Sequence, residues 1–357
     1  MSGAARARVV VGMSGGVDSS VAAALLVEQG FEVVGVTLHL AGSASRCCSL
    51  DDADDARRVA EQLGIRFFVA NQTEAFRREV MEPFADAYLA GRTPIPCVAC
   101  NRRFKFGRLA ERARALGAEA VATGHYARAV RGEDGALELR RARDLEKDQS
   151  YFLFDLDQAQ LARIRFPLGE LTKGEVRARA RALGLATAEK PESHEICFVP
   201  DGDYARVVET LRPGAAPGGG EIVDGEGRVV GRHRGIHHYT VGQRRGLGLP
   251  GPARSYVRAL DAAHNRVVVG TEAELAAAGA RLDGVRWPGG APAAPIEALV
   301  RIRYRHAGAR ARVEPGPGGT ARVAFEAPVA AVAPGQAAVF YDGDRVVGGG
   351  WIAEALG

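Results

Sequence analysis

The chain has 357 residues, of which 46% are hydrophobic and 25% are charged, and its formal net charge is +4. This length predicts two or three domains, and no apolar run reaches the roughly 18 residues that can cross a membrane. A charge of +4 is too small to indicate a nucleic-acid partner by itself. Residues 1–8 lack the apolar segment of a signal peptide, so we expect a cytoplasmic enzyme with no membrane partner.

The first third of the chain alternates between strand and helix patterns. The predicted strands are residues 9–11, 32–38, 65–70 and 120–123, and the predicted helices between them are residues 51–63, 73–90 and 101–116. Pro83 is expected to kink or split the helix that contains it. This alternation is typical of a doubly wound parallel α/β sheet, which binds ligands at the carboxyl ends of its strands.

The pattern changes toward the C-terminus. A hairpin is expected at 127–143, and helices at 157–164 and 172–183, the second with Thr172 as its cap and Glu175 three residues later. The predicted β-runs after about residue 205 are 221–223, 256–260, 266–269, 298–305, 321–325 and 337–341, with one short helix at 272–278. We therefore expect a catalytic domain over 1–204, a small β-rich domain over 205–272 and a C-terminal β-barrel domain over 273–357.

The most informative segment follows the first strand. Residues 9–20 read VVVGMSGGVDSS, a β-branched run, a Gly-rich turn and the start of an apolar helix. Glycines allow a close approach of the backbone, and the N–H groups at a helix start bind anions. The segment lacks the lysine of a P-loop and the pattern of a dinucleotide-binding turn. It therefore predicts a phosphate site of another kind, the alternative being an ordinary strand-to-helix turn.

Five cysteines in a long chain of this kind favour catalytic or metal-binding roles over a disulfide framework. Cys97 and Cys100 form a CxxC that precedes the helix predicted from Asn101. The positive end of that helix and nearby Arg and Lys residues favour a thiolate, so Cys100 is predicted to be a reactive nucleophile. A zinc knuckle would need a second pair of this spacing. Cys47 and Cys48 receive no chemical role.

SGGVDS resembles the pyrophosphate-binding loop of the N-type ATP pyrophosphatases. Together with PCVACN (96–101) and EICF (195–198), it makes the chain resemble the tRNA-specific 2-thiouridylases over nearly its whole length. Further matching segments are ATGHYAR (122–128), KDQSYFL (147–153), FPLGELTK (166–173), HYTVGQRRGLG (238–248) and VRIRYR (300–305). The resemblance implies an ATP-dependent sulfurtransferase that replaces O2 of the wobble uridine of tRNA by sulfur.

The resemblance also implies roles for individual residues. ATP would be bound, with Mg²⁺ on its phosphates, by Gly12, Met13, Ser14, Gly15, Gly16, Val17, Asp18, Ser19, Leu38 and Gly124. Cys197 would carry the incoming sulfur as a persulfide, delivered by a cysteine desulfurase or a sulfur-relay protein, and Cys100 would form a disulfide with it. The tRNA would be contacted by Ile95, Pro96, Cys97, Lys147, Asp148, Gln149, Arg303 and Tyr304.

One departure from the family leaves the mechanism open. Many relatives carry Asp at the position of Cys97 and Asn at that of Ile95, so this chain has a third thiol near the site. Cys97, Cys100 and Cys197 are also a possible ligand set for a 4Fe-4S cluster. We expect persulfide chemistry, with the cluster as the alternative.

Basic residues follow Cys100 on the predicted helix (Arg102, Arg103, Lys105, Arg108, Arg112 and Arg114), and we expect this face to contact RNA. Strand alternation would turn Tyr304 away from Arg303, so both can contact RNA only at a strand end or bend. Two other functions stay open, an ATP-dependent ligase that forms a C–N bond and a tRNA-binding protein with a degenerate nucleotide site. The ligase would not need Cys100 or Cys197, and an intact SGGVDS disfavours the degenerate site.

Overall fold

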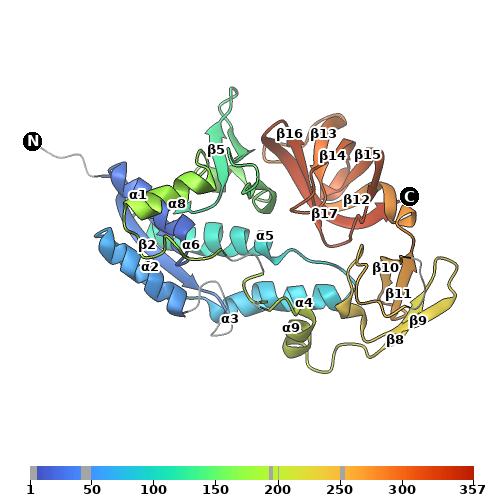
Figure 1. The fold of residues 1–357 in the computed structure, drawn as a ribbon. Coiled ribbons are helices and arrows are strands. Elements are labelled where there is room, and N and C mark those ends of the chain that lie inside the picture. The colour runs from blue at the N-terminus through green and yellow to red at the C-terminus, as the bar shows by residue number, and fades with distance from the viewer. Residues whose placement is uncertain (1–5, 42–49, 193–195, 200, 250–253) are drawn as a thin grey trace, which may run out of the picture. The chain divides into compact units, whose positions relative to one another are not determined.

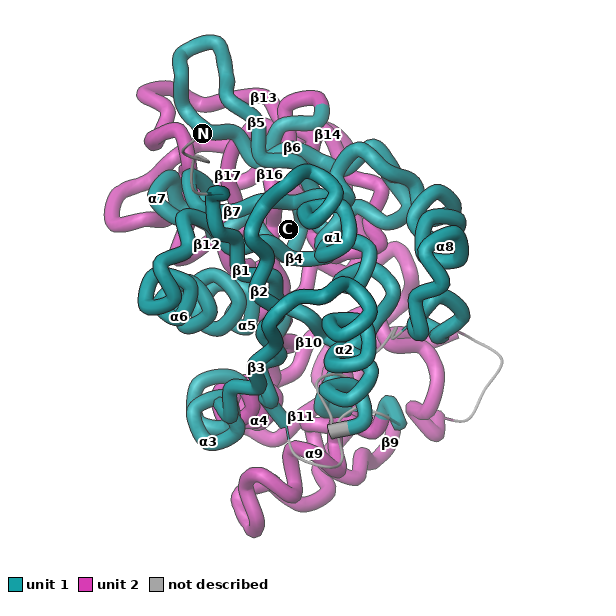
Figure 2. The backbone as a smooth tube through the Cα atoms, turned by 90° about the vertical axis from the view of Figure 1, so that its left-hand side faces the viewer, with its two compact units in different colours: residues 1–80, 97–202, 344–346 teal, residues 81–96, 203–343, 347–357 magenta. Residues whose placement is uncertain are grey.

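The structure is a computed structural model that describes residues 6–41, 50–192, 196–199, 201–249 and 254–357. Cys47, Cys48 and residues 193–195, which include the start of the EICF segment, lie outside the described residues. The chain forms two compact units (Figure 2). Unit 1 contains residues 1–80, 97–202 and 344–346, and unit 2 contains residues 81–96, 203–343 and 347–357.

Unit 1 is built on a parallel sheet with the strand order β3-β2-β1-β4-β7. The strands are β1 (Arg8–Gly12), β2 (Glu32–His39), β3 (Arg66–Asn71), β4 (Ala120–Thr123) and β7 (Ile164–Arg165). Four of them are the predicted strands, so the parallel α/β fold is confirmed. The fifth was missed, because residues 157–164 were expected to be helical. There, α7 (Gln158–Leu161) is short, and the following Phe166–Pro167 disfavours further helix.

Helices cover the sheet because its central strands are apolar on both faces. The helices of unit 1 that pack on the sheet or on one another include α1 (Val17–Glu28), α2 (Leu50–Gln62), α6 (Leu109–Ala115) and α8 (Lys173–Ala182). Val9 and Val11 share one core with α1, α2 and α8, whereas α6 packs against β1 and β4 (Figure 1). Helix α1 is rich in buried alanine, which lets α8 approach it closely. The capping box predicted for α8 is present, with Thr172 and Glu175 bonded reciprocally.

The stretch that carries the CxxC differs from its prediction. The helix starts at Pro96 rather than near Asn101: α5 (Pro96–Cys100) continues into a π-helical turn, Asn101–Arg108, and then into α6. Pro96 has the fixed backbone angle that suits the first position of a helix, which explains the earlier start. Cys97 therefore lies in the first helical turn, and Cys100 lies one turn later. The effect of the helix N-terminus, which was assigned to Cys100, applies to Cys97.

The other expected helix, residues 73–90, is also interrupted. It consists of α3 (Thr73–Phe76), a π-helical turn (Arg77–Met81) and α4 (Glu82–Leu89). Pro83 lies in the first turn of α4, directly after the π-helical turn that interrupts the expected helix. The predicted hairpin of unit 1 is confirmed by β5 (Ala127–Arg131) and β6 (Leu137–Arg141).

Unit 2 contains two β-structures and a helix pair. Strands β10 (Tyr256–Asp261), β11 (Arg266–Gly270), β8 (Gly220–Val223) and β9 (Val229–His233) form a sheet in that order. A second, antiparallel set follows the order β12 (Ala276–Arg286), β15 (Ala321–Ala330), β14 (Ala309–Pro315), β13 (Ile296–Arg301), β16 (Ala337–Asp342) and β17 (Arg345–Leu356). Pairing of β12 with β17 closes this set into a barrel. Helix α9 (Tyr204–Leu211) packs against α4.

The short helix expected at 272–278 is wrong for most of its length. Only Ala273–Leu275 is helical, as one 3-10 turn, and β12 begins at Ala276. Residues 276–282 pair with β15, so tertiary pairing overrides the helix propensity of this Ala-rich segment. Among the described residues, no helix is long and apolar enough to cross a membrane.

Candidate active site

The Gly-rich loop joins β1 to α1 with its backbone N–H groups at the start of the helix. Gly16 is the N-cap of α1 and supplies no side-chain cap. The hydroxyls of Ser19 and Ser20 donate instead to the carbonyl of Gly16, at 3.0 and 2.9 Å. The Ser14 N–H donates to Ser19 Oγ at 3.1 Å, which fixes the turn. The first N–H groups of a helix have no partner within it, so this end of α1 suits an anion.

Two glycines are required by close backbone contacts. Gly15 has φ +70°, and a Cβ there would lie 2.2 Å from the carbonyl oxygen of Asp52. A Cβ on Gly124 would lie 2.7 Å from the backbone nitrogen of Ser19. Gly124 directly follows β4, so the chain after β4 touches the start of α1. These contacts leave room only for glycine.

The remaining residues predicted to bind ATP lie at the same edge of the sheet. Gly12 ends β1, where it pairs with Val36 of β2 and Thr123 of β4. Leu38 is therefore near the end of the neighbouring strand β2, and its side chain is buried. Met13 and Val17 are also buried, so only their backbone groups are available to a ligand. The loop residues, Leu38 and Gly124 thus converge at the carboxyl ends of adjacent strands.

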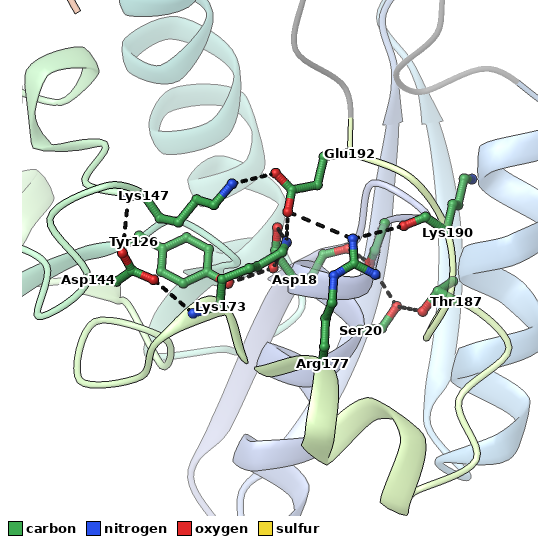
Figure 3. Close-up of polar contacts among 12 residues, drawn as sticks. Asp18, Ser20, Tyr126, Asp144, Lys147, Lys173, Arg177, Thr187, Lys190 and Glu192 are labelled. Carbon is green, nitrogen blue, oxygen red and sulfur yellow. Dashed lines mark hydrogen bonds and ion pairs between the residues drawn. The ribbon is translucent and has the colours of Figure 1, made fainter. Parts of the chain in front are cut away.

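Asp18 is the charged residue of this loop, and its carboxylate is held by two side chains from later in the sequence. Lys173 Nζ lies 2.7 Å from Oδ1 and 2.8 Å from Oδ2, and the Tyr126 hydroxyl donates to Oδ1 at 2.8 Å (Figure 3). Burial and the neighbouring Asp18 charge raise the pKa of Tyr126. Tyr126 therefore stays a hydrogen-bond donor to the carboxylate.

Glu192 is the centre of a second group of charges beside Asp18. Its carboxylate accepts from Lys147 Nζ at 2.8 Å and lies 3.0 Å from Lys173 Nζ and 3.8 Å from Arg177 (Figure 3). Burial acts to raise the pKa of Glu192, but hydrogen bonds from Lys147 and Lys173 outweigh it and lower the pKa to about 2. Lys173 thus joins the loop to the segment that leads toward Cys197.

Replacing Glu192 by glutamine is expected to change how stability depends on pH. A lowered pKa contributes stability that is fully present above the unfolded value, 4.5, and that is lost as pH falls toward about 2. At neutral pH we expect E192Q to be less stable than the original chain by roughly 2 kcal/mol, because solvent screens part of the interaction. The difference should vanish near pH 2. Denaturant unfolding at several pH values measures this.

Glu189 offers the control for that experiment. Its carboxylate pairs with Arg181 at 2.7 Å, but its side chain is 72% exposed. E189Q should therefore change stability only within the small range typical of surface substitutions at any of these pH values. Equal effects of the two substitutions would contradict the structural role assigned to Glu192.

The sequence prediction did not identify Lys173, Glu192, Tyr126 or Arg177 as part of the site. Tyr126 and Lys173 lie in the segments ATGHYAR and FPLGELTK, whose match to the family assigned them no role. That match was the available signal for both. Glu192 and Arg177 lie outside those segments, and no local pattern distinguishes them from surface charges.

The three cysteines of interest lie in unit 1, with Cys100 buried and Cys97 and Cys197 partly exposed. Phe76 connects their segments. Its ring meets Phe104, four residues after Cys100, at 5.3 Å between centroids. It also meets Phe198, the neighbour of Cys197, at 5.9 Å. The segment of Cys197 is thus anchored to the helix of Cys100.

The segment 147–149, predicted to contact tRNA, is tied to the same helix. The Asn101 side chain donates to the carbonyl of Phe152 at 3.1 Å. Asp148 is only 1% exposed, and it accepts hydrogen bonds from Ser150, from Arg141 and from the Ala142 backbone. Its side chain holds this loop and does not face solvent. Gln149 bonds to the backbone of Tyr126, while Lys147 bonds to Glu192.

Several of the basic residues after Cys100 have partners within unit 1. Arg102 pairs with Asp155 at 2.8 Å, and Arg108 pairs with Glu79 at 2.6 Å. Lys105 lies 3.4 Å from the ring of the buried His125. Arg112 and Arg114 are on the following helix α6. Fewer basic side chains than expected are therefore available to RNA, because several of them contact other residues of unit 1.

In unit 2, Arg303 and Tyr304 lie in a bend that follows β13. The strand ends at Arg301, so the alternation that would separate Arg303 from Tyr304 does not continue. Arg301 is buried, and it donates to the carbonyls of His306 (2.9 Å) and Tyr304. It stabilises the bend, whereas Arg303 is exposed. Ile95 and Pro96 also belong to unit 2, with Pro96 buried.

Known protein families match three consecutive parts of the chain. Residues 7–201 match the "tRNA methyl transferase HUP domain", residues 210–271 the "tRNA methyl transferase PRC-barrel domain", and residues 278–352 the "Aminomethyltransferase beta-barrel domain". The first match covers more than half of the chain. The fold and the loop thus define a HUP-domain protein that carries two further β-domains.

Comparison with individual proteins identifies the family within this class. A "tRNA-specific 2-thiouridylase MnmA" of Geobacter metallireducens is 52% identical over 362 residues, covering 99% of this chain and 98% of that protein. A protein of the same name from Chloroflexus aurantiacus is 52% identical over 355 residues, covering 98% of this chain and 99% of that protein. The chain belongs to the family of tRNA-specific 2-thiouridylases.

Proposed function

We propose that this chain is an ATP-dependent tRNA sulfurtransferase that replaces O2 of the wobble uridine by sulfur. The observation that supports this proposal best is that two features of the expected site lie together in unit 1, in a chain that belongs to this family. An uncapped helix N-terminus suited to phosphates lies in the same unit as two thiol-bearing segments that pack on one aromatic residue, Phe76.

The first step activates the uracil. O2 attacks the α-phosphate of ATP, pyrophosphate leaves, and AMP becomes the leaving group at C2. The N–H groups at residues 15–18 would bind the phosphates, and Leu38 and Gly124 would border the adenosine. Mg²⁺, when bound, neutralises charge on the phosphates, and the hard oxygen donors of Asp18 fit this ion. Lys173, which now balances Asp18, is placed to compensate negative charge that enters the loop.

The second step transfers sulfur. A persulfide on Cys197 attacks C2 and AMP leaves, so the sulfur bridges Cys197 and the base. The Cys100 thiolate then attacks Cys197 Sγ, which forms a Cys100–Cys197 disulfide and leaves the thiolate on C2 as 2-thiouridine. A reductant and a new persulfide, supplied through a cysteine desulfurase or a relay protein, complete the cycle. The alternative is a 4Fe-4S cluster held by Cys97, Cys100 and Cys197.

The tRNA would be recognised by groups on both units. Ile95, Pro96 and Cys97 would lie beside the target base, and Lys147 and Gln149 would contact the RNA. The buried Asp148 would act by positioning those two residues rather than by direct contact. Arg303 and Tyr304, in the bend after β13, would also bind tRNA.

Substitutions of two arginines, Arg301 at the end of β13 and Arg303 in the bend, should distinguish an effect on folding from an effect on RNA binding. R303A is expected to weaken tRNA binding and to reduce by about one the slope of log affinity against log salt, because one phosphate contact is lost. R301A should instead lower the free energy of unfolding by about 2 kcal/mol, since it removes a buried side chain and the donor to two partly buried carbonyls. Filter binding across salt concentrations and denaturant unfolding measure the two effects. A salt slope that R303A leaves unchanged would contradict the assignment.

The direct test incubates the protein with ATP, Mg²⁺, a cysteine desulfurase with cysteine, and unmodified tRNA. The expected products are 2-thiouridine at the wobble position and pyrophosphate released only when tRNA is present. Thiolation by an iron-free protein would exclude the cluster, which iron and labile-sulfide assays on anaerobically purified protein can test. Formation of an amide instead, unaffected by Cys→Ser changes, would favour the C–N ligase.

A further inference from the structure

Three potential metal ligands meet in unit 2, and none of them takes part in the proposed reaction. They are Glu209, near the end of α9, and His237 and His238, in the 3-10 turn Ile236–His238. We propose that Glu209, His237 and His238 form a binding site for one divalent transition-metal cation of the Zn²⁺ class. This inference is independent of the proposed thiolation.

The distances within the cluster suit a tetrahedral ion. Glu209 Oε1 lies 3.1 Å from His237 Nε2 and 3.5 Å from His238 Nε2, and one ligand atom of each residue lies within 4.8 Å of the others. Ligands about 2.0–2.1 Å from a zinc ion are separated by roughly 3.3 Å at tetrahedral angles. The separations of the carboxylate from the two imidazoles therefore match those between corners of such a tetrahedron. The fourth would be left for water or another ligand.

The hydrogen bonds of His237 differ from those of His233, a buried histidine nearby in the sequence. The buried His233 uses both ring nitrogens, Nδ1 with the Gly235 N–H at 3.1 Å and Nε2 with the Asn265 carbonyl at 3.0 Å. His237 is only 2% exposed, yet its Nδ1 has no hydrogen-bond partner among the described residues. Its polar contact through Nε2 is with Glu209. A closed hydrogen-bond network therefore does not explain this imidazole.

The turn that carries the imidazoles is fixed in place before any ion binds. The Tyr204 hydroxyl donates to the His238 carbonyl at 3.1 Å, and the Tyr204 ring stacks on Tyr88 at 4.7 Å. Gly235 has φ +147°, and a Cβ there would lie 2.6 Å from Cε1 of His237. The ring of His237 thus packs directly over a glycine backbone. A fixed set of ligands loses little entropy when it binds an ion.

Solvent reaches the cluster through its carboxylate. Glu209 has a half-exposed side chain, which gives an ion access from solvent. A bound ion would join α9 to the turn at 236–238, so its expected effect is to stabilise unit 2.

The test uses full-length protein, stripped of metal and with its thiols alkylated, and Co²⁺ as the spectroscopic probe. We expect one equivalent of Co²⁺ to bind with tetrahedral absorption and without a sulfur-to-cobalt charge-transfer band, and Zn²⁺ to displace it. E209Q and H238A should bind Co²⁺ at least about 100-fold more weakly, because each loses a direct ligand. Zn²⁺ should raise the unfolding temperature of the original chain but not of these variants.

H264A is the matched control, because His264 also pairs with a carboxylate of unit 2, Asp261 at 2.7 Å, but lies outside the cluster. H264A should bind Co²⁺ as the original chain does. Glu209 is exposed, so E209Q is expected to fold, and circular dichroism checks this. Equal Co²⁺ affinity of E209Q and the original chain, or no binding after alkylation, would overturn the site whether or not the protein thiolates tRNA.

Discussion

Replacing Cys197 by serine is expected to abolish thiolation of tRNA, with a loss of at least about 1,000-fold, the scale on which removal of a covalent nucleophile acts. Release of pyrophosphate that depends on tRNA should persist in C197S, because adenylation of O2 does not use a thiol. Mass spectrometry should find one extra sulfur atom on the original chain after incubation with a desulfurase and cysteine, and none at this position in C197S. Loss of both partial reactions would contradict the assignment.

The two other cysteines separate the possible mechanisms. C100S should accept the persulfide on Cys197 and attack C2 with it, but the tRNA should then stay linked to Cys197 through the sulfur, because no thiolate is present to attack Cys197 Sγ. C97S is the matched control: Cys97 lies one helical turn from Cys100, and persulfide chemistry assigns it no transfer step. If C97S loses thiolation as completely as the other two variants, the cluster held by three cysteines becomes the better explanation.

Replacing Gly15 by alanine is expected to eliminate ATP-dependent activity. A Cβ at this position would lie 2.2 Å from the Asp52 carbonyl oxygen, and φ +70° is unfavourable for any L-residue. The loop must therefore move, which takes the N–H groups of the helix start out of position. We expect pyrophosphate release to fall by about 100-fold or more, as misplacement of about 1 Å can cause. Equilibrium binding of ATP and pyrophosphate release measure the change.

Gly30 supplies the control for the backbone conformation alone. It has φ +85°, a Cβ at this position would have no neighbouring atom within 4 Å, and it follows the C-terminal end of α1. G30A should lower the free energy of unfolding by about 1–2 kcal/mol but leave ATP binding intact. If G15A and G30A have equal effects on ATP binding, the close contact with Asp52 is not what the loop requires.

Short sequence patterns predicted the elements of this fold that depend on interactions between residues close in the sequence. The strand runs, the Gly-rich turn, the capping box at Thr172 and the hairpin at 127–143 were each visible within a few residues. Helix starts were less predictable, because Pro96 begins α5 upstream of the basic stretch that suggested a start at Asn101. The 272–278 segment was misassigned because its long-range pairing with β15 is invisible in sequence.

In the candidate site, too, short-range features were predictable and long-range contacts were not. The Gly-rich turn between strand and helix was predictable, but the partners of Asp18 were not, since Lys173 lies 155 residues away in the sequence. Asp148 was expected to contact RNA, and its burial depends on Arg141 and Ser150, which a pattern search treats as ordinary polar residues. Strand alternation also could not reveal that β13 ends at Arg301, before Arg303 and Tyr304.

The position of Phe76 has a consequence for the sulfur transfer that we propose. Its ring is completely buried and touches Phe104 and Phe198 at its edges. In the proposed reaction, a residue with no reactive atom would thus restrict the movement of the segment that carries Cys197. Replacing Phe76 by alanine would remove both ring contacts and loosen the segment of Cys197, so the proposed sulfur transfer would depend on hydrocarbon packing as well as on nucleophiles.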